Sequence, residues 1–236
     1  MIAGISRVRN ESHIIKQTLK HVSKLVDKIY IYDDCSTDNT VEICRQFGEV
    51  IEGKKWESTP EGRNRMEGDG RQIPYEMAVK DGADWVYYFD ADEFADFDGI
   101  DFTADAYRLR LFDFYITEQD KKNGFKSRKW MGPEYRDILM LFRVSPGIRF
   151  YQREPRLPKN YRIEKKGFVK HYGKAISVKE WEKTCDYYAD HRGDDGRFKT
   201  FKEKWTARKG KAIHTKSDFG KDLIQWKDRF TKATPL

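Results

Sequence analysis

The chain has 236 residues, with 46 Lys and Arg against 39 Asp and Glu, and its formal net charge is +7. Hydrophobic residues make up 38% and aromatic residues 14%, which is enough apolar material for a folded core. Without an apolar run near the roughly 20 residues of a membrane-spanning helix, and without a signal-peptide pattern, we expect no transmembrane segment and no secretory leader. Membrane-spanning, collagen-like and disulfide-framework classes are thereby excluded.

Cysteine usage bears on the compartment in which the chain works. The three cysteines, Cys35, Cys44 and Cys185, contain no C-x-x-C pair, and an odd number cannot all be bridged within one chain. A reducing compartment is the simpler interpretation, so we expect a cytoplasmic location.

Strand and helix patterns alternate through the first 97 residues. The predicted elements are strands at 2–6, 29–32, 50–51 and 85–89, and helices at 15–26, 40–47 and 75–80, with a polar loop over 54–70 before the last helix. The continuous apolar run Trp85-Val86-Tyr87-Tyr88-Phe89 is typical of a strand covered on both faces. This alternation predicts a parallel, doubly wound α/β half.

The remainder of the chain reads differently. Alternation over 107–111 predicts a half-buried strand, and residues 138–144 and 148–151 flank Ser145-Pro146-Gly147 as a hairpin would. From Val178 to about Phe230 the pattern is polar and helical. We therefore expect a mixed or antiparallel second half and a helical C-terminus.

Acidic residues follow two of the predicted strands. Asp33 and Asp34 come after the Ile29–Tyr32 run, and Asp90-Ala91-Asp92-Glu93 follows the 85–89 run. Ligands of open α/β sheets bind outside the carboxyl ends of the strands, and carboxylates clustered there repel one another unless a cation joins them. Strand alternation would put Asp90 and Asp92 on the same side. Their oxygens suit Mg²⁺ or Mn²⁺, although solvated loop acids or helix caps are the plainer alternative.

Four segments in order resemble the motifs of family 2 glycosyltransferases with the GT-A fold. These enzymes transfer sugars from nucleotide-sugar donors. The matching segments are Asn10-Glu11 of P-x-Y-N-E, residues 32–40 of V-D-D-G-S-T-D-x-T, Arg71 with Ala78 and Gly82 of an R-N-x(5)-A-x-G helix, and residues 89–94 of L-D-A-D-D/E. The resemblance covers about 95 residues and is weak beyond Phe97.

The sequence departs from the family pattern at three informative positions. Arg7 replaces the usual Pro and Arg9 the usual Tyr, so an arginine would stack on the base or pair with phosphate where the family has an aromatic ring. Cys35 replaces a Gly, which predicts a turn without positive φ.

The resemblance implies a GT-A-like, Rossmann-like fold with a mostly parallel central sheet flanked by helices. Residues 1–97 would be the nucleotide-sugar-binding half, and 98–236 the acceptor-binding half of the same domain. Asp34 would contact the uracil or ribose, Asp33 would support its turn, and Arg71 would reach the nucleotide. Asp92, assisted by Asp90, would hold Mn²⁺ or Mg²⁺ on the diphosphate. The full set implied for the donor site is Arg7, Arg9, Asp33, Asp34, Arg71, Asp90 and Ala91.

Inverting sugar transfer also needs a carboxylate to take the proton of the acceptor hydroxyl. Asp137, six residues before Arg143, matches the spacing of the family's E-D-x-x-L-x-x-R region and is the first choice. Glu134 is the second, and a surface loop acid is the ordinary alternative for both. His171 follows a short apolar strand and resembles the histidine that completes the metal shell in many GT-A enzymes.

The sequence thus predicts a metal-dependent glycosyltransferase that moves a sugar from a nucleotide-sugar donor, a UDP-sugar by preference, to a glycan or other hydroxyl acceptor with inversion. Two alternatives stay open. A sugar-phosphate nucleotidyltransferase would need a glycine-rich phosphate-binding loop after the first strand, and residues 6–12 contain no glycine. A nucleic-acid-binding module would use the basic stretch Arg197–Lys216, but we expect no nucleic-acid partner. The chain is also compatible with one domain of a longer protein.

Overall fold

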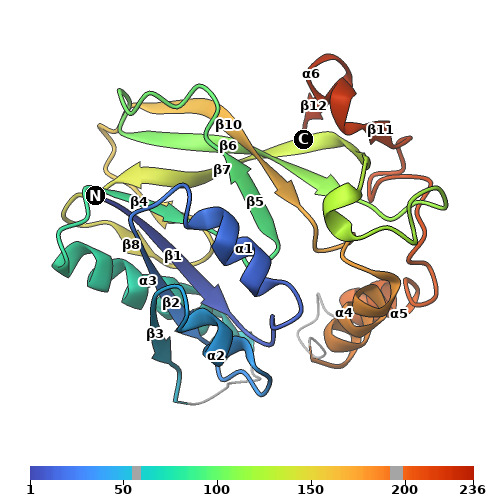
Figure 1. The fold of residues 1–236 in the computed structure, drawn as a ribbon, viewed down its shortest axis with the longest axis horizontal. Coiled ribbons are helices and arrows are strands. Elements are labelled where there is room, and N and C mark those ends of the chain that lie inside the picture. The colour runs from blue at the N-terminus through green and yellow to red at the C-terminus, as the bar shows by residue number, and fades with distance from the viewer. Residues whose placement is uncertain (55–59, 192–198) are drawn as a thin grey trace. The chain divides into compact units, whose positions relative to one another are not determined.

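The computed structural model describes residues 1–54, 60–191 and 199–236 (Figure 1). These residues form two compact units. The first unit comprises Met1–Arg110 and Asp137–Val169, and the second comprises Leu111–Arg136 and Lys170–Leu236. No helix in the described parts of the chain is long and apolar enough to cross a membrane.

The first unit is built on four parallel strands in the order β3-β2-β1-β4. Their bounds are Ile2–Val8 for β1, Lys28–Asp33 for β2, Glu49–Glu52 for β3 and Trp85–Tyr88 for β4. The connecting helices are α1 (Ile15–Val22), α2 (Thr40–Cys44) and α3 (Pro60–Lys80). Helices α1 and α2 lie on one face of these strands and α3 lies on the other (Figure 1), as right-handed crossovers require.

Hydrophobic spacing explains these elements. In α1 the apolar residues Ile15, Leu19 and Val22 recur at helical intervals and are fully buried. All four residues of β4 are buried, which confirms the strand covered on both faces that the apolar run predicts. The predicted doubly wound α/β arrangement of this part of the chain is therefore confirmed.

The strand order creates a switch point at the centre of this sheet. Strand β1 pairs with β2 on one side and with β4 on the other, so the chain reverses its direction of winding between β1 and β4. In open α/β sheets the crevice at such a point, outside the carboxyl ends of the strands, is where ligands bind.

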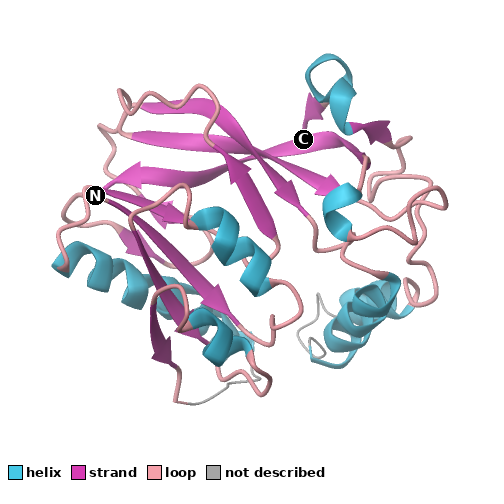
Figure 2. Ribbon diagram, in the orientation of Figure 1, coloured by secondary structure: helices cyan, strands magenta, loops and turns pink. Residues whose placement is uncertain are grey.

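Beyond β4 the sheet becomes mixed, continuing in the order β4-β7-β6-β10-β5. Figure 2 shows the strands in magenta. The added strands are β5 (Glu93–Asp96), β6 (Ala106–Phe114), β7 (Trp130–Arg143) and β10 (Ile163–His171). Strand β7 runs antiparallel to β4. A separate two-stranded sheet pairs β8 (Arg149–Phe150) with β9 (Pro155–Arg156).

The second unit contains the C-terminal helices and a small aromatic core. Helices α4 (Val178–His191) and α5 (Lys199–Thr206) pack together around Trp181, Cys185 and Trp205. Its other elements are short: η1 (Phe125–Ser127), β11 (Ile224–Gln225), η2 (Trp226–Asp228), α6 (Arg229–Lys232) and β12 (Thr234–Pro235).

Helix α3 is longer than the sequence predicts. We expected a polar loop as far as residue 70, but the helix begins at Pro60; residues 55–59 of the expected loop lie outside the described part of the chain. The glycines of this helix have low helix propensity, so the sequence predicts a loop, but their missing side chains let the helix pack closely against its neighbours. A Cβ at Gly68 would lie 2.9 Å from the Phe150 carbonyl oxygen, and one at Gly70 would lie 2.6 Å from Arg7 Cδ.

Two further expectations are wrong in the C-terminal half. The segments around residues 145–147 do not form a hairpin, because β7 pairs with β4 whereas β8 pairs with β9. Continuous helix to Phe230 is also wrong, because α5 ends at Thr206. Gly210 and Gly220, both with positive φ, mark turns in the largely irregular segment that follows.

Candidate active site

The predicted donor residues lie in the first unit, most of them at or just after the carboxyl ends of β1, β2 and β4. Arg7 is the second-to-last residue of β1, Asp33 ends β2, and Asp90 follows β4 by two residues. The parallel pairing of these strands places their ends at one edge of the sheet. The sequence prediction of clustered acids at this edge is consistent with that arrangement.

Arg7 joins the end of β1 to β2 and α3. Its Nη2 donates to Asp34 Oδ2, and its Nη1 donates to Glu67 Oε1 at 2.8 Å. The Asp34 side chain has 0% exposure, and its Oδ1 accepts no hydrogen bond from any residue that the structure describes. Burial raises the pKa of Asp34, although Arg7 and Arg9 act in the opposite direction. Because this carboxylate is fully buried, a ligand could pair with it only if neighbouring side chains moved.

The turn after β2 departs from the sequence expectation at Cys35. This residue has φ +58°, in the left-handed region, so the expected turn without positive φ is wrong. Local hydrogen bonds hold the strained backbone: Asp33 Oδ2 accepts from Ser36 N at 2.9 Å, and Arg9 Nη1 donates to the carbonyl oxygens of Asp34 (2.6 Å) and Cys35 (3.2 Å). Arg9 therefore fixes the turn that carries Asp34.

Arg71 connects α3 to the turn after β4. Its Nη2 donates to Asp90 Oδ1 at 3.0 Å, and its Nη1 donates to Glu67 Oε2 at 2.7 Å. Only 6% of its side chain is exposed, so it is not a solvated surface residue. Burial by itself lowers the pKa of Arg71, but Asp90 and Glu67 outweigh that effect and raise it. The guanidinium is charged at every accessible pH.

Arg153, which the sequence analysis missed, approaches Asp90 from the segment between β8 and β9. Its Nη2 bonds to Glu93 Oε1 and lies 3.7 Å from Asp90 Oδ2, and its Nε donates to Tyr88 Oη at 3.3 Å. Burial by itself lowers the pKa of Arg153, and the Glu93 and Asp90 carboxylates reverse that effect. No sequence spacing signals a contact between residues 60 positions apart.

These contacts form one alternating series of acids and arginines across the strand ends. Its members in order are Asp34, Arg7, Glu67, Arg71, Asp90, Arg153 and Glu93. Four carboxylates alternate with three guanidinium groups, so every buried charge in the series has an opposite neighbour. Such a series could accept a divalent cation at its acids and an anionic group at its arginines by exchanging these internal pairs for the ligands.

Asp92 and Ala91 lie in a turn rather than in a strand. Strand β4 ends at Tyr88, and Glu93 N donates to the Asp90 carbonyl oxygen at 3.2 Å. The alternation expected to put Asp90 and Asp92 on one side is therefore wrong, because alternation applies only to extended backbone. Ala91 is buried and its carbonyl oxygen accepts a bond from Thr18 Oγ1 of α1, whereas Asp92 is partly exposed.

The donor chemistry of this turn suits a hard divalent cation. Two carboxylates, Asp90 and Asp92, offer oxygen ligands, as Mg²⁺ and Mn²⁺ prefer, and such ions are commonly held by one or two carboxylates plus substrate phosphates. Among the described residues no group of three or more His, Cys, Asp or Glu could hold an ion by itself. The residues present fit a cation shared with a phosphorylated substrate.

The two predicted general bases lie within β7, so neither is the surface loop acid of the ordinary alternative. Asp137, in the first unit, pairs through Oδ2 with Lys165 Nζ at 2.6 Å, and its buried Oδ1 has no hydrogen-bond partner among the residues described. Glu134, in the second unit, accepts from Ser217 Oγ at 3.1 Å and is almost fully buried. The sequence spacing alone does not separate these two environments.

His171 lies at the end of β10, in the second unit. Its Nδ1 is 2.5 Å from Asp113 Oδ1. Arg136 and Lys174 also pair with Asp113, at 3.1 and 3.2 Å. Burial by itself raises the pKa of Asp113, but Lys174 and His171 beside it hold that pKa well below its usual range. The predicted metal ligands thus come from both units: Asp90 and Asp92 from the first, His171 from the second.

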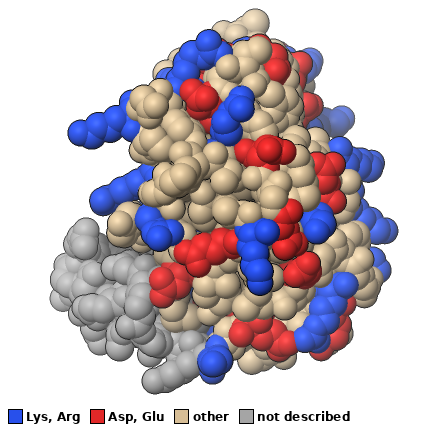
Figure 3. Space-filling view, turned by 90° about the vertical axis from the view of Figure 1, so that its left-hand side faces the viewer, with Lys and Arg blue, Asp and Glu red and all other residues tan. Residues whose placement is uncertain are grey.

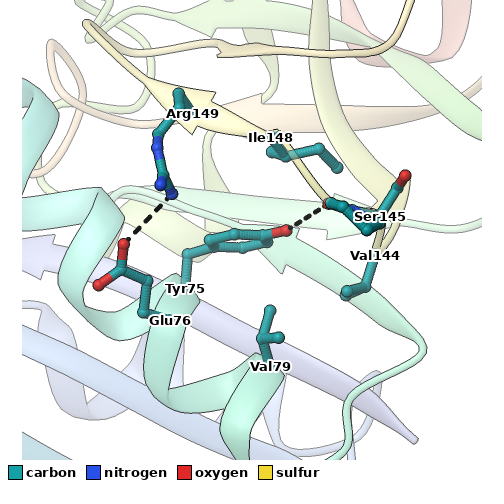
Figure 4. Close-up of a pocket in the computed structure, with 9 residues that line it drawn as sticks. Tyr75, Glu76, Val79, Val144, Ser145, Ile148 and Arg149 are labelled. Carbon is teal, nitrogen blue, oxygen red and sulfur yellow. Dashed lines mark hydrogen bonds and ion pairs between the residues drawn. The ribbon is translucent and has the colours of Figure 1, made fainter.

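A pocket of about 270 Å³ lies elsewhere in the first unit, between α3 and the segment joining β7 to β8 (Figure 4). Tyr75 Oη donates to the Ser145 carbonyl oxygen at 3.3 Å across it, and Arg149 pairs with Glu76 at its rim. None of the predicted site residues lines this pocket. We assign no function to it.

An open α/β sheet with paired acids and arginines at its switch point is typical of domains that bind nucleotides. The family comparison agrees with this class. A model described as glycosyl transferase family 2 matches residues 5–173, so the chain belongs to this family and carries a glycosyltransferase domain. The sequence-based resemblance and the GT-A-like fold class are confirmed.

Solved structures give more distant likenesses. One is glucosyl-3-phosphoglycerate synthase from Mycobacterium tuberculosis in complex with Mn²⁺, UDP and glucosyl-3-phosphoglycerate, at 19% identity over 52% of this chain and 47% of that chain, with a TM-score of 0.34. The chain thus covers less than half of that synthase. Another is a putative nucleotide-diphospho-sugar transferase from Desulfovibrio desulfuricans G20, at 10% identity over 90% and 96% of the two chains, with a TM-score of 0.36. Comparison with curated proteins gives no match.

Proposed function

We propose that the chain transfers a sugar from a nucleotide-sugar donor, a UDP-sugar by preference, to a hydroxyl acceptor, with a divalent cation and with inversion. The observation that supports this most directly is the contact between Arg71 and Asp90 at the switch point. It places a guanidinium group, which can bind phosphate, 3.0 Å from a carboxylate, which can bind a metal ion. Both lie at the edge of the sheet where ligands bind in open α/β folds.

The nucleoside would be bound near the end of β2. Asp34 Oδ1 is a buried acceptor without a partner among the described residues, and an uncompensated acceptor of this kind has a free-energy cost until a donor reaches it. A uracil N–H or a ribose hydroxyl is such a donor. Arg7, which pairs with Asp34, would then move to pair with base or phosphate, while Asp33 and Arg9 keep the turn in place.

The diphosphate would lie near Asp90 and Asp92. These two carboxylates would hold Mn²⁺ or Mg²⁺, and the cation would neutralise negative charge on the leaving nucleoside diphosphate. Arg71 supplies a second positive charge for the same group. The buried Ala91 shapes the turn that carries both carboxylates.

Asp137 is the residue that we propose as the general base. Its Oδ1 has no hydrogen-bond partner among the described residues and can accept a proton, while Lys165 orients the other oxygen. Glu134 is the second candidate, but its oxygen already accepts from Ser217. The acceptor would be a glycan or another hydroxyl compound bound by residues 98–236.

The alternatives left open by the sequence are less well supported. Family membership favours sugar transfer over nucleotidyl transfer. For nucleic acid, the side chains of residues 197–201 in the basic stretch lie outside the description. On the face drawn in Figure 3, basic and acidic side chains are interspersed over the described residues rather than separated into one basic surface.

A panel of nucleotide sugars tests this proposal. Donor hydrolysis and thermal unfolding would be measured with each compound, with Mn²⁺, with Mg²⁺ and with a chelator. A ligand at 100 times its Kd should stabilise the folded chain by about 2.7 kcal/mol, so one nucleoside class should raise Tm clearly, and only with metal. If no nucleotide sugar changes Tm or is hydrolysed with either cation, the proposal is wrong.

A further inference from the structure

Two arginines from different elements hold the same carboxylate. Arg71 of α3 donates to Asp90 Oδ1 at 3.0 Å, and Arg153, between β8 and β9, lies 3.7 Å from Asp90 Oδ2. Each oxygen of Asp90 therefore faces its own guanidinium group. The Arg71 side chain is 6% exposed and the Arg153 side chain 30% exposed, so solvent screens the Arg71 pair less than the Arg153 pair.

Arg153 is itself held in place from behind. Its Nη2 bonds to Glu93, whose side chain has 0% exposure, and its Nε bonds to Tyr88. Glu93 in turn accepts a bond from the Asp90 backbone N–H at 3.1 Å. These contacts fix the Arg153 guanidinium group beside Asp90. An arginine that only carried charge at the surface would not need such support.

We propose that Arg153 binds the diphosphate of the donor, and that Arg71 and Arg153 occupy Asp90 until the donor takes over their guanidinium groups. Asp90 is then available to the divalent cation. This inference rests on the proposed function and extends it with a residue that neither the sequence nor the family motifs single out.

The charge balance of the site carries the inference. Guanidinium groups match phosphate geometry as well as they match carboxylate geometry, so a diphosphate can replace Asp90 as their partner. A carboxylate paired with two guanidinium groups is a poor ligand for a cation, since the same oxygens would have to serve both. Donor and cation should therefore bind with positive coupling, and each should increase the affinity of the other by the same factor.

The test variant is Arg153→Met combined with Glu93→Gln. The double substitution removes the arginine without leaving the buried Glu93 charge uncompensated, and Gln can still accept from the Asp90 N–H. Arg153→Lys is the second variant, because it keeps the positive charge and loses only the ability of the planar guanidinium group to donate two parallel hydrogen bonds. Arg149→Met is the matched control: Arg149 lies in β8, pairs with Glu76 on the surface and is remote from Asp90 in sequence and contacts.

Calorimetric titration would measure Mn²⁺ alone, UDP alone, and UDP in the presence of Mn²⁺. In the double variant we expect UDP with Mn²⁺ to bind about 10- to 100-fold more weakly, the range for losing a charged hydrogen-bonding group. We expect Mn²⁺ alone to bind about 5-fold or more tightly than in the wild type, because Asp90 has lost one competing partner. Arg153→Lys should show a smaller loss of UDP affinity, and Arg149→Met should match the wild type.

A purely structural Arg153 would weaken both ligands together. If Mn²⁺ alone binds no more tightly in the double variant, or UDP binds equally well in every variant, the inference is overturned. The wild-type titration separates this failure from failure of the proposed function. If the wild type binds UDP only with Mn²⁺, the proposed function stands even though the inference about Arg153 is overturned. Wild type that binds no nucleotide overturns both.

Discussion

Arg71 Nη2 donates to Asp90 Oδ1 at 3.0 Å, joining the middle of α3 to the turn after β4. The helix and the turn meet at the switch point of the sheet, where β1 lies between β2 and β4. Arg71 also pairs with Glu67, and Glu67 pairs with Arg7. The contact therefore links the proposed diphosphate-binding residues after β4 with the proposed nucleoside-binding residues after β2. A substitution at either end of the series should therefore alter nucleotide binding.

Asp34→Asn keeps the size of the buried side chain and removes its charge. We expect UDP itself to bind more weakly by about 1.5–3 kcal/mol, since the proposed contact is to the nucleoside and not to the sugar. Calorimetric titration with UDP and Mn²⁺ checks this. Asp81→Asn is the control, because Asp81 pairs with Lys28 and Tyr30 toward the amino end of β2, away from the carboxyl ends of the strands. Unchanged UDP affinity in Asp34→Asn would move the nucleoside site elsewhere.

Asp137→Asn keeps the shape of the proposed base and removes its proton acceptor. The turnover number should fall by roughly 10²- to 10⁴-fold while the donor Michaelis constant barely moves. Steady-state kinetics with a donor identified from the panel gives both values.

Glu134→Gln is the internal comparison for that experiment. Its oxygen can still accept from Ser217, so transfer should stay near the wild-type rate. A large loss in Glu134→Gln with little change in Asp137→Asn would exchange the two roles. No loss in either variant would place the base outside β7.

Asp113→Asn tests the charge cluster around His171. The folded-state pKa of Asp113 lies below its unfolded value of 3.8, so its contribution to stability is complete above that pH and is lost as the pH falls toward the folded-state pKa. Breaking this partly buried cluster should lower the free energy of unfolding by about 3 kcal/mol at pH 7. Urea unfolding at pH 7 and pH 3 should show the gap to wild type narrowing at the lower pH. A gap that stays constant or widens would contradict the assigned ion pairs.

The sequence predicts the part of the site that depends on local pattern. Asp34 and Asp90 follow apolar strands, and parallel strands of this order bring their ends to one edge of the sheet. Arg153 could not be predicted in this way. Its partner Glu93 lies 60 positions away, and only the placement of the β8–β9 segment joins them.

The fold expectations failed where tertiary packing overrides local propensity. Gly68 and Gly70 suggest a loop, yet their missing side chains let α3 approach Phe150 and Arg7. Cys35 suggests an ordinary turn, yet the bonds around it hold its φ at +58°. Residues 138–151 contain a turn signal, but β7 lies between β4 and β6 in the sheet, and β8 pairs with β9 instead.

The central claim is that the turn after β4 binds a nucleotide through a divalent cation. The most direct measurement is calorimetric titration of UDP into wild type and Asp92→Ala, each with Mn²⁺ and with a chelator. Asp92 is partly exposed in a turn, so the variant should fold normally and retain its Tm. We predict that wild type binds UDP only with Mn²⁺ and that Asp92→Ala loses this metal-dependent binding. Equal, Mn²⁺-dependent UDP binding in both proteins would contradict the claim.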